Sequence, residues 1–595
     1  MHRLPALGEE LSAMLVYGDQ REHARPETIA RKINREFECI AEMAPGMERH
    51  SRLVGALIEA GRLLQGIADA AFAKAKRDHR DSSTHALCNS LVELGCAVCC
   101  SWDSGFDQVG PVPRLQARTD WPDEVEMRVP EGYAFYALYP EAYLDAARRL
   151  TLRAPPRVIG IRSIGTSLGA IVAAALDAPA PVTVRPLGDP FDRRIAMDES
   201  LERELLEGEA HYIIVDEGPG QSGSSFGAVA DWLLERGVPL NRIALLPGHS
   251  GPPGTEASEP LLQMWRSVQR QAGDFGERWP ELIADWCSAE IGTVDEPPVD
   301  LSGGAWRSLL WRNEQEWPAV VPAWERRKFL LRSGGATLLA KFAGLGRIGE
   351  DKLAMAGTLR CEGLVPEPIA LVHGFLIERW YDDAAPLGRD ERPLGEIGGY
   401  IGTRARLLPA MTDSGASVDE LLRMVRRNIS LEFGEGAACI VEPWDSRAAD
   451  LERRIVRVRT DNRLDRHEWL RMRSGALIKT DALDHHQAHD LIGCQDVAWD
   501  VAGALVEFDV PQEQSGELVE AIEHWSGTEV DRELLAFYRL AYLAFRLGSA
   551  RLGTFMIGDS ADRARIDRRA TLYATELRHL LESSAPESRP ESLVG

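Results

Sequence analysis

The sequence lacks long apolar runs and a secretory leader. None of its 595 residues lies in a run approaching the roughly eighteen apolar residues that cross a bilayer. The N-terminus, MHRLPALGEELSAM, has no uninterrupted apolar segment of the kind that directs secretion. These absences predict a cytoplasmic protein with no membrane-spanning segment and no membrane partner.

Positive charge is also scarce. The chain has 68 Lys and Arg against 92 Asp and Glu, which gives a net charge of −24 at pH 7. Because nucleic-acid backbones are bound largely by clustered basic side chains, this balance excludes a general nucleic-acid binder. Local basic sites for one small anion remain compatible with it.

Cysteines are few and mostly scattered. Nine occur, and four of them lie close together, Cys88, Cys96, Cys99 and Cys100. They do not form the two CxxC pairs that are typical of a zinc site. We therefore expect reduced, packed thiols, with zinc binding as the alternative.

Apolar residues, by contrast, make up 44% of the chain, and its length suits about three or four domains. Residues 20–100 have apolar side chains at helical spacing. Between 130 and 255, short apolar runs alternate with helical ones, which predicts a parallel sheet with ligands at the carboxyl ends of its strands. A second α/β-like region from about residue 317 runs into long helices.

The most informative segment is HYIIVDEGPGQSGSSFGAVADWLLERG, residues 211–237. An apolar run ends in two acids, Asp216 and Glu217, and a Gly/Ser-rich turn at 218–225 leads into a helix. Glycine backbones, serine hydroxyls and a helix N-terminus together cradle a phosphate, while the acids can hold the hydroxyls of an attached sugar. An ordinary strand-to-helix turn is the alternative.

The segment IIVDEGPGQSGSS resembles the phosphoribosyl-pyrophosphate (PRPP) loop of the type I phosphoribosyltransferases. Gln221 and Ser222 depart from the Thr and Gly that are usual in that family. The resemblance implies a catalytic site in which Asp216 and Glu217 bind the ribose hydroxyls. It also implies that the 5-phosphate is bound by Gly220, Gln221, Ser222, Gly223, Ser224 and Ser225.

Two neighbouring stretches extend the resemblance. VIGIRSIGTSLG, residues 158–169, is similar to the pyrophosphate loop of the family, which implies roles for Arg162, Ser163, Gly165 and Thr166. A basic stretch follows that contains Arg185, Arg193 and Arg194, where the family has a mobile loop over the leaving pyrophosphate. Neutralising that anion is what the reaction needs, since its transition state separates a cationic sugar from pyrophosphate.

The same residues also allow a hydrolase. Gly165 to Gly169 fits the G-x-S-x-G pattern of a nucleophile elbow, with Ser167 as nucleophile and with Asp216 and His249 following in the order of that fold. This alternative leaves the acids and the Gly/Ser turn unexplained.

A second resemblance begins at Trp324. WERRKFLLRSGGATLLAKFAGLG and the helix and apolar strand after it are similar to the small lobe and hinge of the aminoglycoside phosphotransferases and choline kinases. The resemblance implies that Lys341 and Glu350 act at the nucleotide phosphates and that the backbone from Glu378 to Trp380 meets adenine.

The catalytic region of that family is also represented. DVAWDVA, residues 496–502, resembles the motif that follows the metal-binding Asp, which implies Asp461 as catalytic base, with Asp481 and Glu468 as Mg²⁺ ligands. No His-Gly precedes Asp461, and His467 or Glu468 stands in place of the usual Asn. A pseudokinase is therefore an open alternative. A transition-metal site formed by Asp484, His485, His486 and His489 in an inserted loop is another.

Together these patterns predict a multidomain α/β and α+β enzyme. A helical hood (1–130) leads into a phosphoribosyltransferase-like parallel-sheet domain (131–255), a linker and helical connector (256–315), a bilobal kinase-like domain (316–585) and a flexible tail (586–595). The expected activities are phosphoribosyl transfer from PRPP to a small acceptor and phosphoryl transfer from ATP, both with Mg²⁺ and with phosphate-bearing small molecules as substrates. A homo-oligomer is compatible with this prediction, and a nucleotide- or PRPP-sensing regulator with a pseudokinase half is the alternative.

Overall fold

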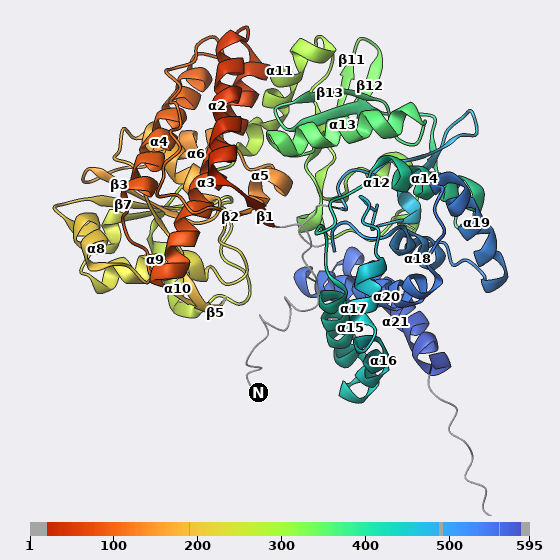
Figure 1. The fold of residues 1–595 in the computed structure, drawn as a ribbon. Helices are drawn as coiled ribbons and strands as arrows, with labels where there is room; N and C mark the ends of the chain where they lie inside the picture. Colours follow the sequence, from red (N-terminus) through yellow and green to blue (C-terminus); the bar gives the residue numbers. More distant parts are fainter. Residues whose placement is uncertain (1–20, 190, 487–491, 559, 585–595) are drawn as a thin grey trace, which may run out of the picture.

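The computed structural model describes residues 21–189, 191–486, 492–558 and 560–584 (Figure 1). Within these ranges, no helix is both long and apolar enough to cross a membrane. The chain builds one parallel and one antiparallel sheet of five strands each. Figure 1 shows the first half of the chain, red to yellow, beside the second half, green to blue.

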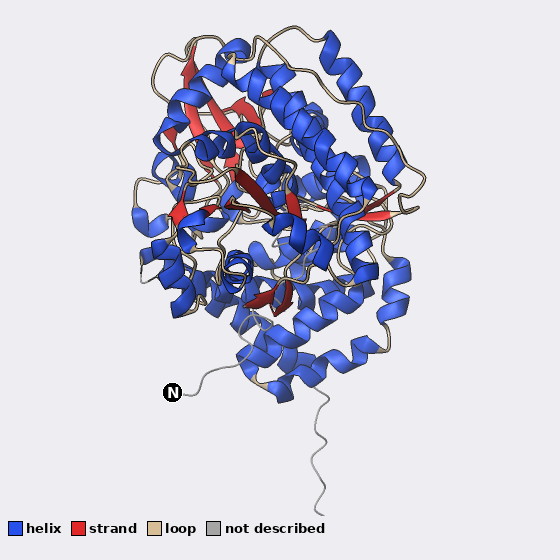
Figure 2. Ribbon diagram, turned by 90° about the vertical axis from the view of Figure 1, so that its left-hand side faces the viewer, coloured by secondary structure: helices blue, strands red, loops and turns tan. Residues whose placement is uncertain are grey.

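Long helices form the start of the chain. The elements are β1 (Arg21–Ala24), α2 (Pro26–Glu42), α3 (Met47–Ala75), α4 (Ser82–Asp103), β2 (Val125–Arg128), α5 (Glu131–Phe135) and α6 (Pro140–Arg148). α4 begins where the Asp81 carboxylate accepts hydrogen bonds from the backbone N–H groups of Ser83 and Thr84, both at 2.8 Å. α3 is buried along most of its length, and α2, α4 and β2 pack against it. Figure 2 shows helices of this half in front of the strands.

The predicted parallel sheet is confirmed. Its strands are β3 (Pro156–Ile161), β4 (Val182–Val184), β7 (His211–Val215), β8 (Ile243–Leu246) and β9 (Gln269–Arg270). They lie in the order β4-β3-β7-β8-β9, so the strand order reverses between β3 and β7. The connections contain α7 (Gly165–Ala175), the hairpin of β5 (Leu187–Asp189) and β6 (Asp192–Arg194), α8 (Glu199–Leu206), α9 (Ser224–Glu235) and α10 (Glu259–Ser267). Open sheets of this kind bind ligands at the carboxyl ends of the strands beside such a reversal.

The antiparallel sheet lies in the order β10-β11-β12-β14-β13. Its strands are β10 (Val299–Asp300), β11 (Lys328–Ser333), β12 (Ala336–Phe342), β13 (Pro368–Val372) and β14 (Phe375–Arg379), with α13 (Arg347–Cys361) between β12 and β13. Gly334 and Gly335 join β11 to β12 with φ of +55° and +77°, a two-residue turn that glycine adopts without strain. β9 and β10 both come from the segment 256–315, so this segment contributes a strand to each sheet.

Helices dominate the rest of the chain. They are α14 (Leu394–Leu407), α15 (Val418–Phe433), α16 (Glu442–Asp445), α17 (Ala448–Arg454), α18 (Val497–Glu507), α19 (Ser515–Ser526), α20 (Arg532–Met556) and α21 (Ala561–Ser584). A three-stranded sheet of β15 (Ala385–Pro386), β16 (Trp469–Arg471) and β17 (Leu477–Lys479) lies among them. Two further helices, α11 (Trp279–Ile291) and α12 (Arg307–Leu310), precede β11.

The apolar cores do not follow the order of the chain. One core joins the N-terminal helices, one face of the parallel sheet, α11 and one face of the antiparallel sheet, and it includes Leu57, Ile213 and Phe342. The C-terminal helices form a second core with α13, and α9 and α10 cover the other face of the parallel sheet in a third. The start of α13 and the helix α3 approach each other closely, since a Cβ atom added to Gly346 would lie 2.9 Å from the Cα atom of Gly55 in α3.

Candidate functional site

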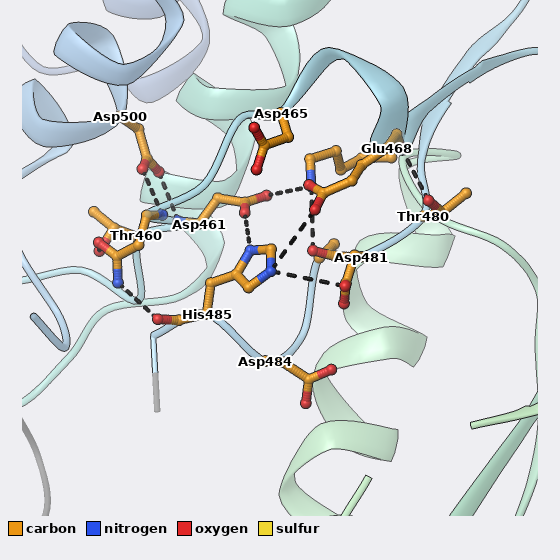
Figure 3. Close-up of polar contacts among 12 residues, drawn as sticks. Thr460, Asp461, Asp465, Glu468, Thr480, Asp481, Asp484, His485 and Asp500 are labelled. Carbon is orange, nitrogen blue, oxygen red and sulfur yellow. Dashed lines mark hydrogen bonds and ion pairs between the residues drawn. The ribbon is translucent and has the colours of Figure 1, made fainter. Parts of the chain in front are cut away.

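A cluster of charged side chains lies in the C-terminal half of the chain, and its labelled members come from residues 460–485 and from Asp500 (Figure 3). Asp500 on α18 accepts hydrogen bonds from the backbone N–H groups of Asp461 and Asn462 at 2.7 and 2.9 Å. Asn462 has a φ of +65°, which asparagine tolerates, and its side chain donates to the carbonyl of His485 at 3.0 Å. The second acid of the DVAWD motif therefore fixes the loop that contains Asp461.

Asp461, the predicted base, is fully buried. Its carboxylate accepts hydrogen bonds from Tyr400 Oη and, at 2.9 Å, from His485 Nδ1, and it lies 3.5 Å from Lys479 Nζ. Burial alone would raise a carboxyl pKa, but Lys479 and His485 outweigh it and hold the pKa of Asp461 below its usual value. His485 thus stands between Asp461 and the rest of the cluster (Figure 3).

The structure brings the two predicted metal ligands together. One donor atom each of Glu468, Asp481 and His485 lies within 4.8 Å of the other two. His485 Nε2 is 3.9 Å from Glu468 Oε1 and 3.8 Å from Asp481 Oδ2. Lys479 Nζ contacts Glu468 Oε2 at 2.5 Å, yet burial raises the pKa of Glu468 to about 7. Carboxylate oxygens are the ligands that Mg²⁺ prefers, so the donor set fits this ion.

Lys341 reaches the cluster from β12. Its ammonium group forms ion pairs with Asp481 and, at 2.6 Å, with Asp484. Burial disfavours the ammonium form, but the two carboxylates outweigh it and raise the pKa of Lys341. Lys352 on α13 also pairs with Asp484, at 2.5 Å, and burial lowers the pKa of Lys352 to about 8. Two lysines therefore face the acids from the antiparallel sheet and its helix.

A cavity of about 100 Å³, here called the hinge cavity, lies between Lys341 and the end of β14. Glu378 and the residues 379–381 line it, at the place where adenine was expected, and burial raises the pKa of Glu378 to about 7. Trp306 also lines it and stacks on His467, with ring centroids 5.8 Å apart. A residue from the segment before β11 therefore forms part of this wall.

A cavity of about 150 Å³, the middle cavity, lies on the other side of the cluster. It shares five lining residues with the hinge cavity, Glu325, Lys328, His467, Glu468 and Asp481. Four arginines add to its wall, Arg326, Arg463, Arg546 and Arg569. Glu468 and Asp481 of the cluster in Figure 3 thus line both cavities, and the middle cavity has the more basic wall.

A third cavity, the sheet-edge cavity, has a volume of about 650 Å³ and lies at the carboxyl end of β7. Asp216 and Glu217 follow β7 directly, beside the reversal of strand order, and both line the cavity. Tyr136 and Trp324 line the middle cavity as well as this one. The three cavities therefore follow one another through shared walls.

The pKa values of the two acids at the sheet edge are both raised. Burial raises the pKa of Asp216 to about 7 against the opposing backbone N–H of Glu217 and the charge of Arg185. Burial, together with the charges of Glu131 and Asp216, raises the pKa of Glu217 well above its usual value. Carboxyl groups placed in this way become ionised when a cation joins them.

The Gly/Ser turn forms another wall of the sheet-edge cavity. Its lining residues are Gly218, Pro219, Gly220, Gln221, Ser222, Ser224 and Ser225. Gly223 precedes α9 with a φ of +63°, and a Cβ atom there would lie 2.8 Å from Pro253 Cγ, so glycine is required. The N-terminus of α9 begins at this turn, where its dipole favours an anion.

Two arginines expected at the pyrophosphate are paired inside the protein instead. Arg162 is buried and forms ion pairs with Asp78 and, at 3.0 Å, with Asp69. Arg185 also pairs with Asp69, and its backbone N–H donates to Asp78 at 2.9 Å. Both acids come from the N-terminal helical segment and lie 84 to 116 residues before the arginines that they pair with. These pairs fasten that segment to the parallel sheet.

Of the other predicted residues, Arg193 lines the sheet-edge cavity and the rest do not. Arg193 lines the sheet-edge cavity, whereas the side chain of Arg194 is 83% exposed and lies 3.6 Å from Asp192. Ser163, Gly165 and Thr166 are not among the described residues that line it, and Thr166 is buried. Glu350 is exposed on α13 and faces Arg52 and Glu36, away from the cluster.

The hydrolase alternative does not fit the structure. Ser167 is 3% exposed, its Oγ donates to the carbonyl of Ile164 at 3.1 Å, and it lies 2.9 Å from Tyr133 Oη. His249 lines the sheet-edge cavity, but Ser167 is not among the described lining residues. A nucleophile needs an accessible oxygen beside a base, and Ser167 has neither.

The structure bears differently on the two alternative metal sites, the four close cysteines and the histidine-rich inserted loop. Among the described residues, the four close cysteines belong to no group of potential metal ligands, and burial raises the pKa of Cys88 and Cys99 to about 12. Of the inserted loop, His485 faces Glu468 and Asp481, and His486 is buried. His489 lies outside the described residues.

Sequence reasoning missed Tyr400, Lys479 and Trp306. Tyr400 and Lys479 contact Asp461 from 61 residues before and 18 residues after it, and only folding brings them there. Lys479 could have been found, because it stands two residues before Asp481 in IKTD. Trp306 belongs to a Trp-rich stretch without a recognisable pattern, so its place in the hinge cavity had no signal.

No protein-family model matches the chain, and no match was found among the curated proteins. Solved structures similar to it include LicA in complex with AMP, with 15% identity and a TM-score of 0.35 over 50% of this chain and 99% of that one. Another structure of LicA is described as a choline kinase from Streptococcus pneumoniae.

Two further structures show a similar extent. A choline/ethanolamine kinase family protein from Mesorhizobium loti has 14% identity and a TM-score of 0.33 over 51% of this chain and 98% of that one. Spectinomycin phosphotransferase APH(9)-Ia, in complex with ADP and spectinomycin, has 9% identity and a TM-score of 0.31 over 51% of this chain and 98% of that one. Known kinases and phosphotransferases are thus similar to about half of the chain.

Proposed function

We propose that the C-terminal half transfers a phosphoryl group from ATP to a hydroxyl group of a small molecule. The observation that carries this proposal is the convergence of Lys341, Glu468, Asp481 and His485 between the hinge cavity and the middle cavity. Phosphoryl transfer needs positioning and charge stabilisation rather than much covalent chemistry, and this cluster offers both signs of charge at one place.

The residues divide the work as follows. Lys341 contacts the ATP phosphates once they displace its carboxylate partners. Glu468 and Asp481 hold Mg²⁺, which neutralises charge on the phosphates when bound. His485 Nε2 takes the proton of the acceptor hydroxyl, while Asp461 holds Nδ1 and the ring orientation. Asp461 then acts through His485, whereas the sequence predicts that it is the base itself.

Calorimetry with ATP and Mg²⁺ on the full chain tests this proposal. Lys341→Ala should weaken ATP binding by about tenfold or more, as loss of a charge-assisted phosphate contact does. Lys74→Ala, which removes an exposed lysine of α3, is the matched control and should bind like the wild type. Equal binding by both variants, or no binding by the wild type, would contradict the proposal. ATP binding without turnover on any acceptor would favour the sensor with a pseudokinase half.

For the sheet-edge cavity we infer phosphoribosyl transfer from PRPP. The specific observation that favours it is the acid pair and the Gly/Ser turn on one cavity at the strand reversal. Asp216 and Glu217 would hold the ribose hydroxyls with Mg²⁺, the turn the 5-phosphate, and Arg193 the pyrophosphate. The double variant D216N/E217Q should lose PRPP binding in calorimetry, and D192N, an exposed acid of β6, should keep it. Undisturbed binding in D216N/E217Q would refute this role.

The shared walls suggest how the two activities are linked. Among the described residues, Tyr136 and Trp324 alone line both the sheet-edge cavity and the middle cavity. A ligand in the sheet-edge cavity therefore lies next to the middle cavity, where we place the phosphoryl acceptor. We therefore propose that the product of the sheet-edge reaction is the phosphoryl acceptor. PRPP supplied together with the phosphoribosyl acceptor should then raise ATP turnover by the wild type and leave it unchanged in D216N/E217Q. No effect of PRPP on turnover in either protein would separate the two activities.

A further inference from the structure

Three potential metal ligands meet in the interior, away from both sites. His50 Nε2 lies 2.7 Å and His373 Nε2 3.0 Å from the same oxygen, Glu141 Oε1. All three side chains are 0% exposed. His50 comes from α3, Glu141 from α6 and His373 from the turn between β13 and β14. The group thus connects the N-terminal helices, the approach to the parallel sheet and the antiparallel sheet.

The far side of each imidazole is also occupied. His50 Nδ1 lies 2.9 Å from Ser101 Oγ, and His373 Nδ1 lies 3.0 Å from Ser51 Oγ. In metal sites, an outer oxygen that accepts from one ring nitrogen fixes the tautomer and leaves the other nitrogen for the ion. Both histidines have a serine oxygen at Nδ1, with Nε2 directed at the centre of the group, where its proton must leave when an ion binds.

The carboxylate of the group is only partly satisfied by hydrogen bonds. Burial opposes ionisation of Glu141, but His373 and His50 outweigh it and lower its pKa. Glu141 Oε2 has no hydrogen-bond partner among the residues that the structure describes. An ionised carboxylate is therefore buried with one oxygen unsatisfied, beside rings such as Phe106 and Trp286.

We propose that His50, Glu141 and His373 form a structural zinc site. Two imidazole nitrogens and one carboxylate oxygen of Glu141 give three donors, and N and O donors of this kind suit zinc. Donors of a tetrahedral zinc site lie about 3.3 Å apart, so binding requires the present contacts to lengthen by a few tenths of an ångström. The complete burial of the three side chains keeps a substrate out, as in sites that stabilise a fold rather than catalyse a reaction.

The experiment uses the full chain, expressed with added zinc and dialysed. Mass spectrometry of the metal content should find about one tightly bound zinc per chain, and X-ray absorption should show two histidine ligands. Glu141→Gln keeps a hydrogen-bonding side chain of the same size but removes the charge. It should lose the zinc and lower the melting temperature, while the melting temperature of the wild type should fall when zinc is removed by a chelator.

Further variants exclude the other potential site. D481N/H485A alters the cluster of Figure 3 and should retain the zinc, which separates this proposal from the proposed phosphotransferase. His373→Asn is a second probe if Glu141→Gln fails to fold. A wild type without zinc, or equal zinc content in the wild type, Glu141→Gln and His373→Asn, would overturn the proposal and leave a hydrogen-bonded network only.

Discussion

Asp500 offers the sharpest test of how the cluster is built. Its side chain is buried, at 3% exposure, and accepts two backbone hydrogen bonds at 2.7 and 2.9 Å from the loop that contains Asp461. In D500A both N–H groups lose their partner in the interior. An unsatisfied buried donor costs about 1–3 kcal/mol, so the variant should lose about 2–6 kcal/mol of stability.

The loss of stability should be measurable both in the melting of the C-terminal helices and in the loop itself. The melting transition that includes the C-terminal helices should fall by roughly 5–20 °C, since about 1 kcal/mol shifts a domain of this size by a few degrees. Hydrogen exchange measured by mass spectrometry should speed up in peptides that cover residues 458–466. Phosphoryl transfer should be lost as well, because His485 is held to the same loop through Asn462.

The control is D509N. Asp509 carries an equally charged side chain that is 90% exposed and lies 3.3 Å from Arg392, so its removal should cost at most about 1 kcal/mol. If D500A melts and exchanges like D509N, then α18 does not fix the loop and the geometry of the cluster has another cause.

Three further predictions follow from single residues. Because burial raises the pKa of Asp216 to about 7, this carboxyl becomes ionised as the pH rises through neutrality, and calorimetry should find Mg²⁺-dependent PRPP binding stronger at about pH 8 than at about pH 6. D216N should remove most of that pH dependence. Arg307→Ala breaks a part-buried ion pair with Asp562 at 2.6 Å and should cost about 1–3 kcal/mol in thermal unfolding. Ser167→Ala removes a hydroxyl that donates to Ile164 and lies 2.9 Å from Tyr133 Oη, so it should cost about 1–3 kcal/mol. It should leave both proposed activities intact, because Ser167 is not among the described residues that line the three cavities.

Patterns that repeat along the chain were predictable. The alternation of apolar runs and helices predicts the parallel sheet, and the acids after β7 lie at its carboxyl edge because a strand, a turn and a helix are contiguous in sequence. The motif 496–500 likewise predicts the neighbourhood of Asp461. In each case the residues involved are fixed by local geometry or by a short motif.

Contacts between distant segments were not predictable. The sequence assigns Arg162 and Arg185 to an anion because basic residues near a glycine-rich loop usually bind one. Their partners are Asp69 of α3 and Asp78 of the connection between α3 and α4, and the place of these helices on the sheet is set by a core of many side chains. Similarly, His485 enters the cluster through an inserted loop, and no period or spacing in the sequence indicates which way such a loop folds.

The first apolar core has a practical consequence for dissecting the protein. It runs from α3 through α11 to Phe342 and Phe375 of the antiparallel sheet, so it crosses the boundaries that the sequence suggests near residues 130, 255 and 315. A fragment that begins at residue 316 would leave one face of that sheet in water, and such a face favours aggregation. We therefore expect the two halves to fold only when they are expressed together, and a truncation meant to remove one half should also unfold the other.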